Sequence, residues 1–143
     1  MGNAWTVERM LELGRHHAAI ETERDLEGTL ATLVPEPVYE FWPMGWRMVG
    51  MDPARRYYEH LMGSFMPSLR GFEMIEEWAS PSSVTQEYSI EVAVDGAAET
   101  HRVIGVLFYG DDEHLGGERI WASERCVRLM AGDGLIDEIS AKR

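Results

Sequence analysis

Cysteine is nearly absent from this sequence, because Cys126 is the single one among 143 residues. One thiol cannot form a disulfide within the chain, so a scaffold held together by disulfides is excluded. Proteins of the reducing cytoplasm commonly lack disulfides, and we therefore predict a cytoplasmic protein. The thiol lies among apolar residues and is interpreted as a small buried hydrophobic group.

Positive charge is also scarce, and long apolar runs are missing. Lys and Arg number 13 against 25 Asp and Glu, which gives a net charge of −12. Such a surface repels phosphate backbones, so nucleic acid is not an expected partner. No run approaches the roughly 18 apolar residues of a membrane span, and Glu8 and Glu12 interrupt the region where a signal peptide would be apolar. We expect no membrane partner.

Motifs that indicate a metal or a cofactor are missing as well. The sequence has no C-x-x-C, P-loop, G-x-G-x-x-G or G-x-S-x-G. His16 and His17 are adjacent, so on a helix they diverge and cannot chelate a metal as an i, i+4 pair does. The acidic stretch 111–114 lacks the ligand spacing of a calcium loop. The prediction is no metal and no cofactor.

The apolar spacing that is present predicts helices in the first half of the chain. Helical periodicity marks 5–20 and 25–32, with Asp25 as the N-cap of the second segment and Pro35 ending it. Asp52 is predicted to cap a third helix, with Pro53 at its first position and its end near residue 65. Two short strands, 38–42 and 46–49, are expected between the second and third helices.

The second half of the chain has the alternation of β-strands. Strands are predicted at 72–79, 84–94, 101–109 and from Glu118 to about Met130, with Asp95-Gly96 as a hairpin turn. Helices followed by antiparallel strands indicate the α+β class. We expect one domain over residues 1–143, with a sheet that curls over the helices and leaves a volume for a ligand.

The strand at 101–109 is apolar on both of its faces. Val103 and Leu107 alternate with Ile104 and Val106, so both faces have to be covered. The helices can cover one face, and a second copy of the chain is the simplest cover for the other. The sequence therefore predicts a homodimer formed through the β-sheet.

Three stretches, in this order, resemble the nuclear transport factor 2-like superfamily. D-L-E-G at 25–28 begins a helix that is followed by V-Y-E-F-W-P at 38–43. G-M-D-P-A at 50–54, followed by R-Y-Y at 56–58, resembles the family's G-x-x-A-x-x-x-F/Y helix start. G-E-R-I-W at 117–121 resembles the G-E-R-V-Y opening of the last strand in SnoaL-like members.

This resemblance implies a fold and a range of activities. The fold is a cone-shaped curved antiparallel β-sheet wrapped around N-terminal helices, a cystatin-like α+β barrel, here as a single SnoaL-like domain. Members include ketosteroid isomerases, polyketide cyclases, dehydratases, epoxide hydrolases and pocket proteins without known activity, and dimers are common. On this chain the ketosteroid isomerase tyrosine falls on His17, its base on Phe41 or Trp42, and its protonated aspartic acid on Gly105. The SnoaL-like acid falls on Ser123, so neither mechanism is expected in its known form.

His17 and Glu124 are the candidate catalytic residues. His17 lies on the first helix and, as the resemblance implies, points into the pocket, where a neutral imidazole can accept or donate a proton near pH 7. Glu124 shares strand parity with Ile120 and Ala122, where a carboxyl would pair with another group or have a raised pKa. The alternatives are a packing histidine and a Glu–Arg surface pair, and both remain open.

The candidate ligand-binding residues are aromatic or lie near the expected cavity. They are Trp42, Trp46, Tyr57, His101, Gly105 and Trp121. The aromatic rings suit a flat apolar ligand, although each could equally be core. The hypothesis is proton-transfer chemistry of the isomerase, cyclase or dehydratase type on an apolar carbonyl compound. The alternative is a non-catalytic binding or dimeric assembly module.

Overall fold

A computed structural model describes residues 4–141 of the chain, so the predicted domain extends at both ends beyond the described residues. The helical segments are α1 (Val7–Thr22), α2 (Leu26–Ala31), α3 (Met51–His60), the π-helical turn η1 (Leu61–Phe65), the 3₁₀ turn η2 (Met66–Ser68), α4 (Glu124–Ala131) and α5 (Asp133–Ser140). The strands are β1 (Leu33–Trp42), β2 (Trp46–Val49), β3 (Leu69–Ser80), β4 (Ser83–Val94), β5 (Ala97–Asp111) and β6 (His114–Trp121).

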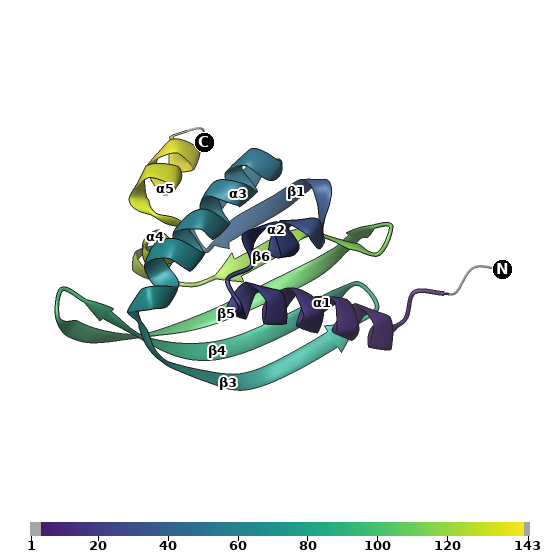
Figure 1. Ribbon diagram of the computed structural model, residues 1–143, viewed down its shortest axis with the longest axis horizontal. Coiled ribbons are helices and arrows are strands. Elements are labelled where there is room, and N and C mark those ends of the chain that lie inside the picture. The colour runs from purple at the N-terminus through teal and green to yellow at the C-terminus, as the bar shows by residue number, and fades with distance from the viewer. Residues whose placement is uncertain (1–3, 142–143) are drawn as a thin grey trace.

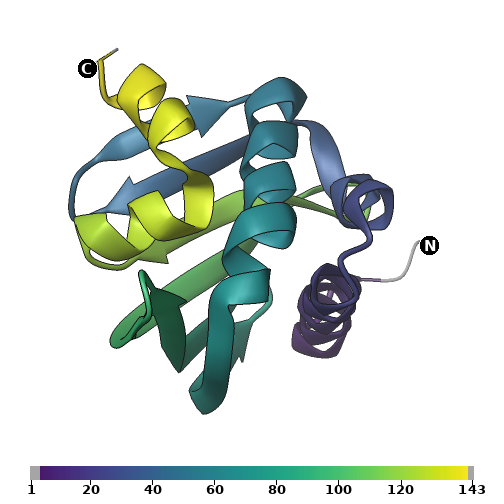
Figure 2. The same ribbon diagram turned by 60° about the vertical axis from the view of Figure 1, so that its left-hand side comes forward.

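The strands form one curved sheet that has all the helices on its concave side (Figures 1 and 2). Their order is β2-β1-β6-β5-β4-β3, and neighbours are antiparallel except for the parallel pair β1 and β6. Helix α1 packs on β3 and β4, α3 on β1, and α5 on β2. This is the predicted α+β architecture, a bent sheet wrapped around helices.

Side-chain caps explain where several helices begin. The Thr6 hydroxyl accepts from the backbone N–H of Arg9 at the start of α1, and the Asp25 carboxylate accepts from the N–H of Gly28 at the start of α2. Each cap satisfies a donor that would otherwise lack a partner in the first turn. The prolines that follow α2 lie in β1, where its pairing with β6 is interrupted between Leu33 and Val38.

The start of the third helix differs from the prediction. Gly50, with φ of 109°, occupies the N-cap, and no side chain caps this helix. Asp52 lies inside the first turn, so its assignment as the N-cap is wrong. The helix continues as predicted to residue 65, but its last turn, η1, is a π-helix.

The last strand is shorter than predicted, and this changes the position of Glu124. Strand β6 ends at Trp121, where the Ser123 hydroxyl accepts from the N–H of Cys126 at 3.0 Å and begins α4. The segment expected to continue the strand to about Met130 is therefore helical. Helix α5, which follows Gly132, was not predicted.

Tyrosine and aliphatic side chains between the sheet and α3 form the core. Tyr39, Tyr57, Tyr58 and Phe41 are almost fully buried and contact one another through their rings. Within residues 4–141, no helix has both the length and the apolar character needed to cross a bilayer.

Candidate functional site

A cavity of about 620 Å³ lies between the C-terminal half of α1, the turns after α3 and the concave face of the sheet. Most of its wall is apolar. The residues that line it are His17, Ala18, Ala19, Glu21, Thr22, Arg24, Leu61, Phe65, Met66, Leu69, Phe72, Met74, Gln86, Tyr88, Ile90, Leu107, Glu118 and Met130. Its size falls in the range of small-molecule sites.

Polar groups enter the cavity from one face of α1. His17 and Glu21 follow the helical spacing i, i+4 and share that face of α1, and Arg24 follows in the turn after the helix, where its φ is 59°. Exposure increases along the chain: the side chain of His17 is 1% exposed, that of Glu21 is 27% exposed, and Arg24 is exposed to solvent. The stripe therefore runs from the protein interior to the rim of the cavity.

A chain of hydrogen bonds fixes the ring of His17. The Thr32 hydroxyl donates to the carbonyl oxygen of Thr29 at 2.7 Å, so it accepts from Nδ1–H of His17 at 2.6 Å. The other ring nitrogen, Nε2, lies 3.0 Å from the hydroxyl oxygen of Tyr58 and accepts a hydrogen bond from this hydroxyl. Tyr39 in turn donates to the Tyr58 oxygen at 2.5 Å. This arrangement selects the neutral imidazole protonated on Nδ1.

Protonation would give His17 a different partner. Glu21 Oε2 lies 3.3 Å from Nε2 of His17, one helical turn along α1. Burial raises the pKa values of Tyr39 and Tyr58 well above the usual range, so both hydroxyls keep their protons. A proton that reaches Nε2 would therefore form an ion pair with Glu21 while Tyr58 gives up its bond to the ring.

Glu118 brings a second carboxyl group to the cavity. It lies on β6 opposite Leu107, and its carboxyl extends into the space above Gly105, where an added Cβ would be 2.5 Å from Oε2. Burial among apolar groups, reinforced by repulsion from Glu21, raises the pKa of Glu118 to about 8. At neutral pH this side chain is therefore a carboxylic acid that can donate a hydrogen bond.

The two predicted catalytic residues lie in different parts of the molecule. His17 lines the cavity, as described above. Glu124 is exposed in the first turn of α4, where it accepts a hydrogen bond from Arg128 at 3.0 Å. The structure therefore does not bring Glu124 to His17, and the carboxyls that lie near His17 are Glu21 and Glu118.

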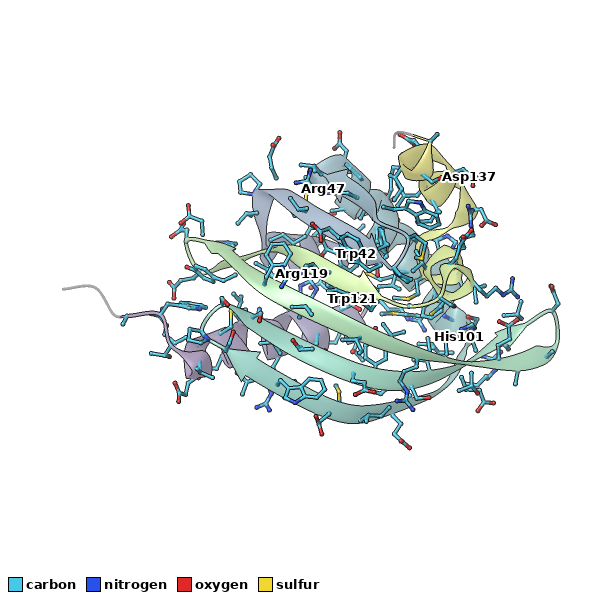
Figure 3. All side chains as sticks on the ribbon, turned by 180° about the vertical axis from the view of Figure 1, so that it is seen from behind. Trp42, Arg47, His101, Arg119, Trp121 and Asp137 are labelled. Atoms are coloured by element: carbon cyan, nitrogen blue, oxygen red, sulfur yellow. The ribbon has the colours of Figure 1, made fainter. Side chains whose placement is uncertain are left out.

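The predicted ligand-binding residues are also dispersed. Trp42 and Trp121 stack on the convex face of the sheet with ring centroids 6.5 Å apart, on the side opposite to the helices (Figure 3). Trp46 and Tyr57 are buried in the core. His101, near the β4–β5 hairpin, contacts Glu99 at 3.0 Å. None of these five residues lines the cavity, whereas Gly105 borders it through its contact with Glu118.

Sequence reasoning missed Glu118 although the signal was available. The alternation that placed Glu124 on the face of Ile120 and Ala122 places Glu118 on the same face. Glu118 lies inside the true strand, whereas Glu124 follows the end of that strand. The helix cap at Ser123 was the sign that the alternation stops there.

The site offers proton donors and acceptors rather than metal ligands. Among residues 4–141, no group of three or more His, Cys, Asp or Glu side chains is placed to hold a metal ion. What the cavity presents is a carboxylic acid, a carboxylate and an oriented imidazole beside an apolar wall. These groups suit hydrogen bonding to a carbonyl oxygen and proton transfer to or from carbon.

Comparison with known proteins supports the fold. No family model matches the sequence, and no curated protein matches it. An NTF2-like protein from Anabaena variabilis is similar in structure, with a TM-score of 0.66 and 16% identity over 87% of this chain and 96% of that one. A steroid delta-isomerase from Pseudomonas aeruginosa has a TM-score of 0.66 and 17% identity, over 94% and 93% of the two chains. PrhC from Penicillium brasilianum has a TM-score of 0.64 and 14% identity, over 95% and 91%.

The chain is therefore a pocket-bearing protein with the nuclear transport factor 2-like (NTF2-like) fold. The resemblance found in the sequence is confirmed at the level of the fold. Identities this low carry the architecture but not the activity of the similar structures.

Proposed function

We propose that this protein binds a small apolar carbonyl compound in its cavity and moves a proton at the carbon next to the carbonyl. The observation that supports the proposal most strongly is the position of Glu118 in a mostly apolar cavity, where burial raises its pKa to about 8, because a neutral carboxylic acid can stabilise a developing oxyanion. An isomerase, a cyclase and a dehydratase each need this step.

Glu118 would be the hydrogen-bond donor, and the Glu21–His17 pair would hold the proton. In this scheme the substrate oxygen accepts a hydrogen bond from the Glu118 carboxyl. Glu21 takes the proton from carbon and shares it with Nε2 of His17, which lies 3.3 Å away. The proton then returns to a different carbon, and no external oxidant or reductant is needed. Proton transfer can shift a double bond, and donation to a leaving hydroxyl would give a dehydration.

Deuterium exchange in heavy water tests this chemistry without knowledge of the natural substrate. Benzylacetone serves as the probe, and nuclear magnetic resonance follows deuterium at the carbons beside its carbonyl. We expect the native protein to accelerate exchange and Glu118→Gln to slow it by about 10²-fold, the usual loss when one oxyanion donor is removed. The exchange should also fall above about pH 8, where Glu118 ionises.

Two further variants make the experiment decisive. Glu36→Gln, at an exposed position of β1, is the matched control and should leave the exchange rate unchanged. Glu124→Gln tests the sequence-based assignment directly, and we expect it to retain the native rate. Exchange at the background rate in the native protein, with benzylacetone bound, would favour the non-catalytic binding module instead.

The convex face supports a second proposal, a homodimer formed through the sheet. Ile104 and Phe108 on β5 are only half-buried there, and Trp121 is 39% exposed beside Trp42. Arg119 covers part of this surface, with its guanidinium carbon 4.9 Å from the centroid of the Phe108 ring. Apolar side chains on the face without helices are what a second copy of the chain would bury.

A further inference from the structure

The inner end of the cavity holds two carboxyl groups and no permanent cation. Among residues 4–141 no hydrogen bond to Glu118 is found, and the polar partner found for Glu21 is the imidazole of His17, with Oε2 and Nε2 3.3 Å apart. Of the described residues that line the cavity, Arg24 alone has a permanent positive charge, and it lies exposed in the turn after α1. Carboxyls that are partly withdrawn from water are normally paired or metal-bound. Glu21 and Glu118 are both half-buried, and neither has a permanent cation beside it among the described residues that line the cavity.

The wall that faces these carboxyls is suited to a positive charge on an apolar body. Phe65, Phe72 and Tyr88 present aromatic rings, and Met66, Met74 and Met130 present thioethers. Aromatic faces attract cations, and thioethers adapt to the shape of a ligand. The net charge of −12 also favours the entry of a cation over that of an anion.

We propose that the cavity also binds apolar organic ammonium ions, with the ammonium group between Glu118 and Glu21 and the apolar body against the aromatic and methionine wall. The only bond that breaks in this step is the O–H bond of the Glu118 carboxyl, whose proton passes to solvent, and the resulting carboxylate pairs with the ammonium group. The proposal rests on the cavity of the proposed function but not on its proton-transfer chemistry.

The protonation of Glu118 then selects the charge of the ligand. The titratable groups that interact electrostatically with Glu118 are Glu21 on α1, Tyr39 on β1, Tyr57 and Tyr58 on α3, and Tyr88 on β4, and His17 on α1 lines the same cavity. Burial raises the pKa values of all four tyrosines well above the usual range, so they stay neutral while Glu118 titrates. A neutral carbonyl compound binds the protonated form of Glu118, and an ammonium ion binds the ionised form.

Two probes with the same carbon skeleton separate the two modes of binding. They are benzylacetone and the primary amine in which the carbonyl is replaced by a protonated amino group, with a pKa near the roughly 10.4 of lysine. Isothermal titration calorimetry on the full chain measures their affinities at about pH 6.5 and about pH 8.5. We expect the amine to bind on the order of tenfold more tightly at the higher pH, because a larger fraction of Glu118 is ionised there.

Calorimetry in two buffers of different ionisation enthalpy counts the protons released. Amine binding at about pH 6.5 should release close to one proton, and benzylacetone should release none. In Glu118→Gln the proton release should disappear, and the amine should bind about tenfold more weakly at about pH 8.5. Glu21→Gln should weaken amine binding while keeping the proton release, and Glu36→Gln should match the native protein.

The outcomes distinguish this inference from the proposed function. Benzylacetone binding to Glu118→Gln shows that this variant keeps its cavity, so a loss of amine binding there is a loss of charge pairing. An amine affinity that does not change with pH, or amine binding without proton release, overturns the inference while the carbonyl chemistry stands. If neither probe binds the native protein, both proposals fall.

Discussion

At the scale of single residues, Glu118 links the cavity to the pH dependence of stability. Its pKa rises from 4.5 to about 8 on folding, so between these values the folded state holds a proton that the unfolded state has lost. Stability therefore falls as the pH rises from about 4.5 to about 8 and is constant above that range. Glu118→Gln removes this dependence, because glutamine keeps the shape of the side chain without a titrating group.

We expect the free energy of unfolding of Glu118→Gln to equal that of the native protein at about pH 4.5 and to exceed it by roughly 2 kcal/mol at about pH 8.5. This figure allows for water that enters the cavity and weakens the effect of burial. Urea unfolding at both pH values measures the difference. Glu36 is exposed and outside the cavity, so the free energy of unfolding of Glu36→Gln should differ from that of the native protein by the same amount at both pH values. If the free energies of unfolding of Glu118→Gln and the native protein change equally between the two pH values, Glu118 does not have a raised pKa in the folded protein.

At the scale of elements, the pairing of β1 with β6 depends on Gly117. This glycine has φ of +143°, and a Cβ there would lie 1.8 Å from the carbonyl oxygen of Val38. Gly117→Ala would therefore push β1 away from the centre of the sheet, and we expect a loss of more than about 4 kcal/mol or failure to fold. Gly134→Ala is the control, because a Cβ there meets nothing within 4 Å and the change should be neutral or stabilising by up to about 1 kcal/mol. Circular dichroism and urea unfolding compare the two variants.

Local signals predicted most of these elements, and their limits are visible at particular residues. Asp25 marked the start of α2, and Asp95-Gly96 marked the β4–β5 turn, because caps and tight turns depend on neighbours in the sequence. Apolar alternation alone could not show that β6 stops at Trp121, since Ala122 in the following connection and Cys126 in α4 are both buried and keep the parity of the strand. For this reason Glu124 was assigned to the apolar face of a strand, although it lies in the first turn of α4.

The candidate site was less accessible to sequence reasoning because it is assembled from distant parts of the chain. The family resemblance implied that His17 points into the pocket, and His17 does line the cavity. Its hydrogen bonds to Thr32 and Tyr58 span 15 and 41 residues, and no local pattern indicates them. The raised pKa of Glu118 depends on Gly105 leaving room for the carboxyl and on Glu21 facing it across the cavity. Aromatic content alone was misleading, because the stacked pair Trp42 and Trp121 faces away from the helices.

At the scale of the whole molecule, the sheet has one face covered by helices and one without such cover (Figures 2 and 3). If two copies join through the convex face, a charge at Trp121 should separate them, because a carboxylate buried between apolar faces has no partner. We expect the native protein to sediment as a dimer at micromolar concentration and Trp121→Glu as a monomer. Val7→Glu, at an exposed position on α1, is the control and should remain dimeric. Trp121 does not line the cavity, so monomeric Trp121→Glu should still bind benzylacetone. A native protein that sediments as a monomer would exclude the dimer and leave the cavity as the functional feature of the fold.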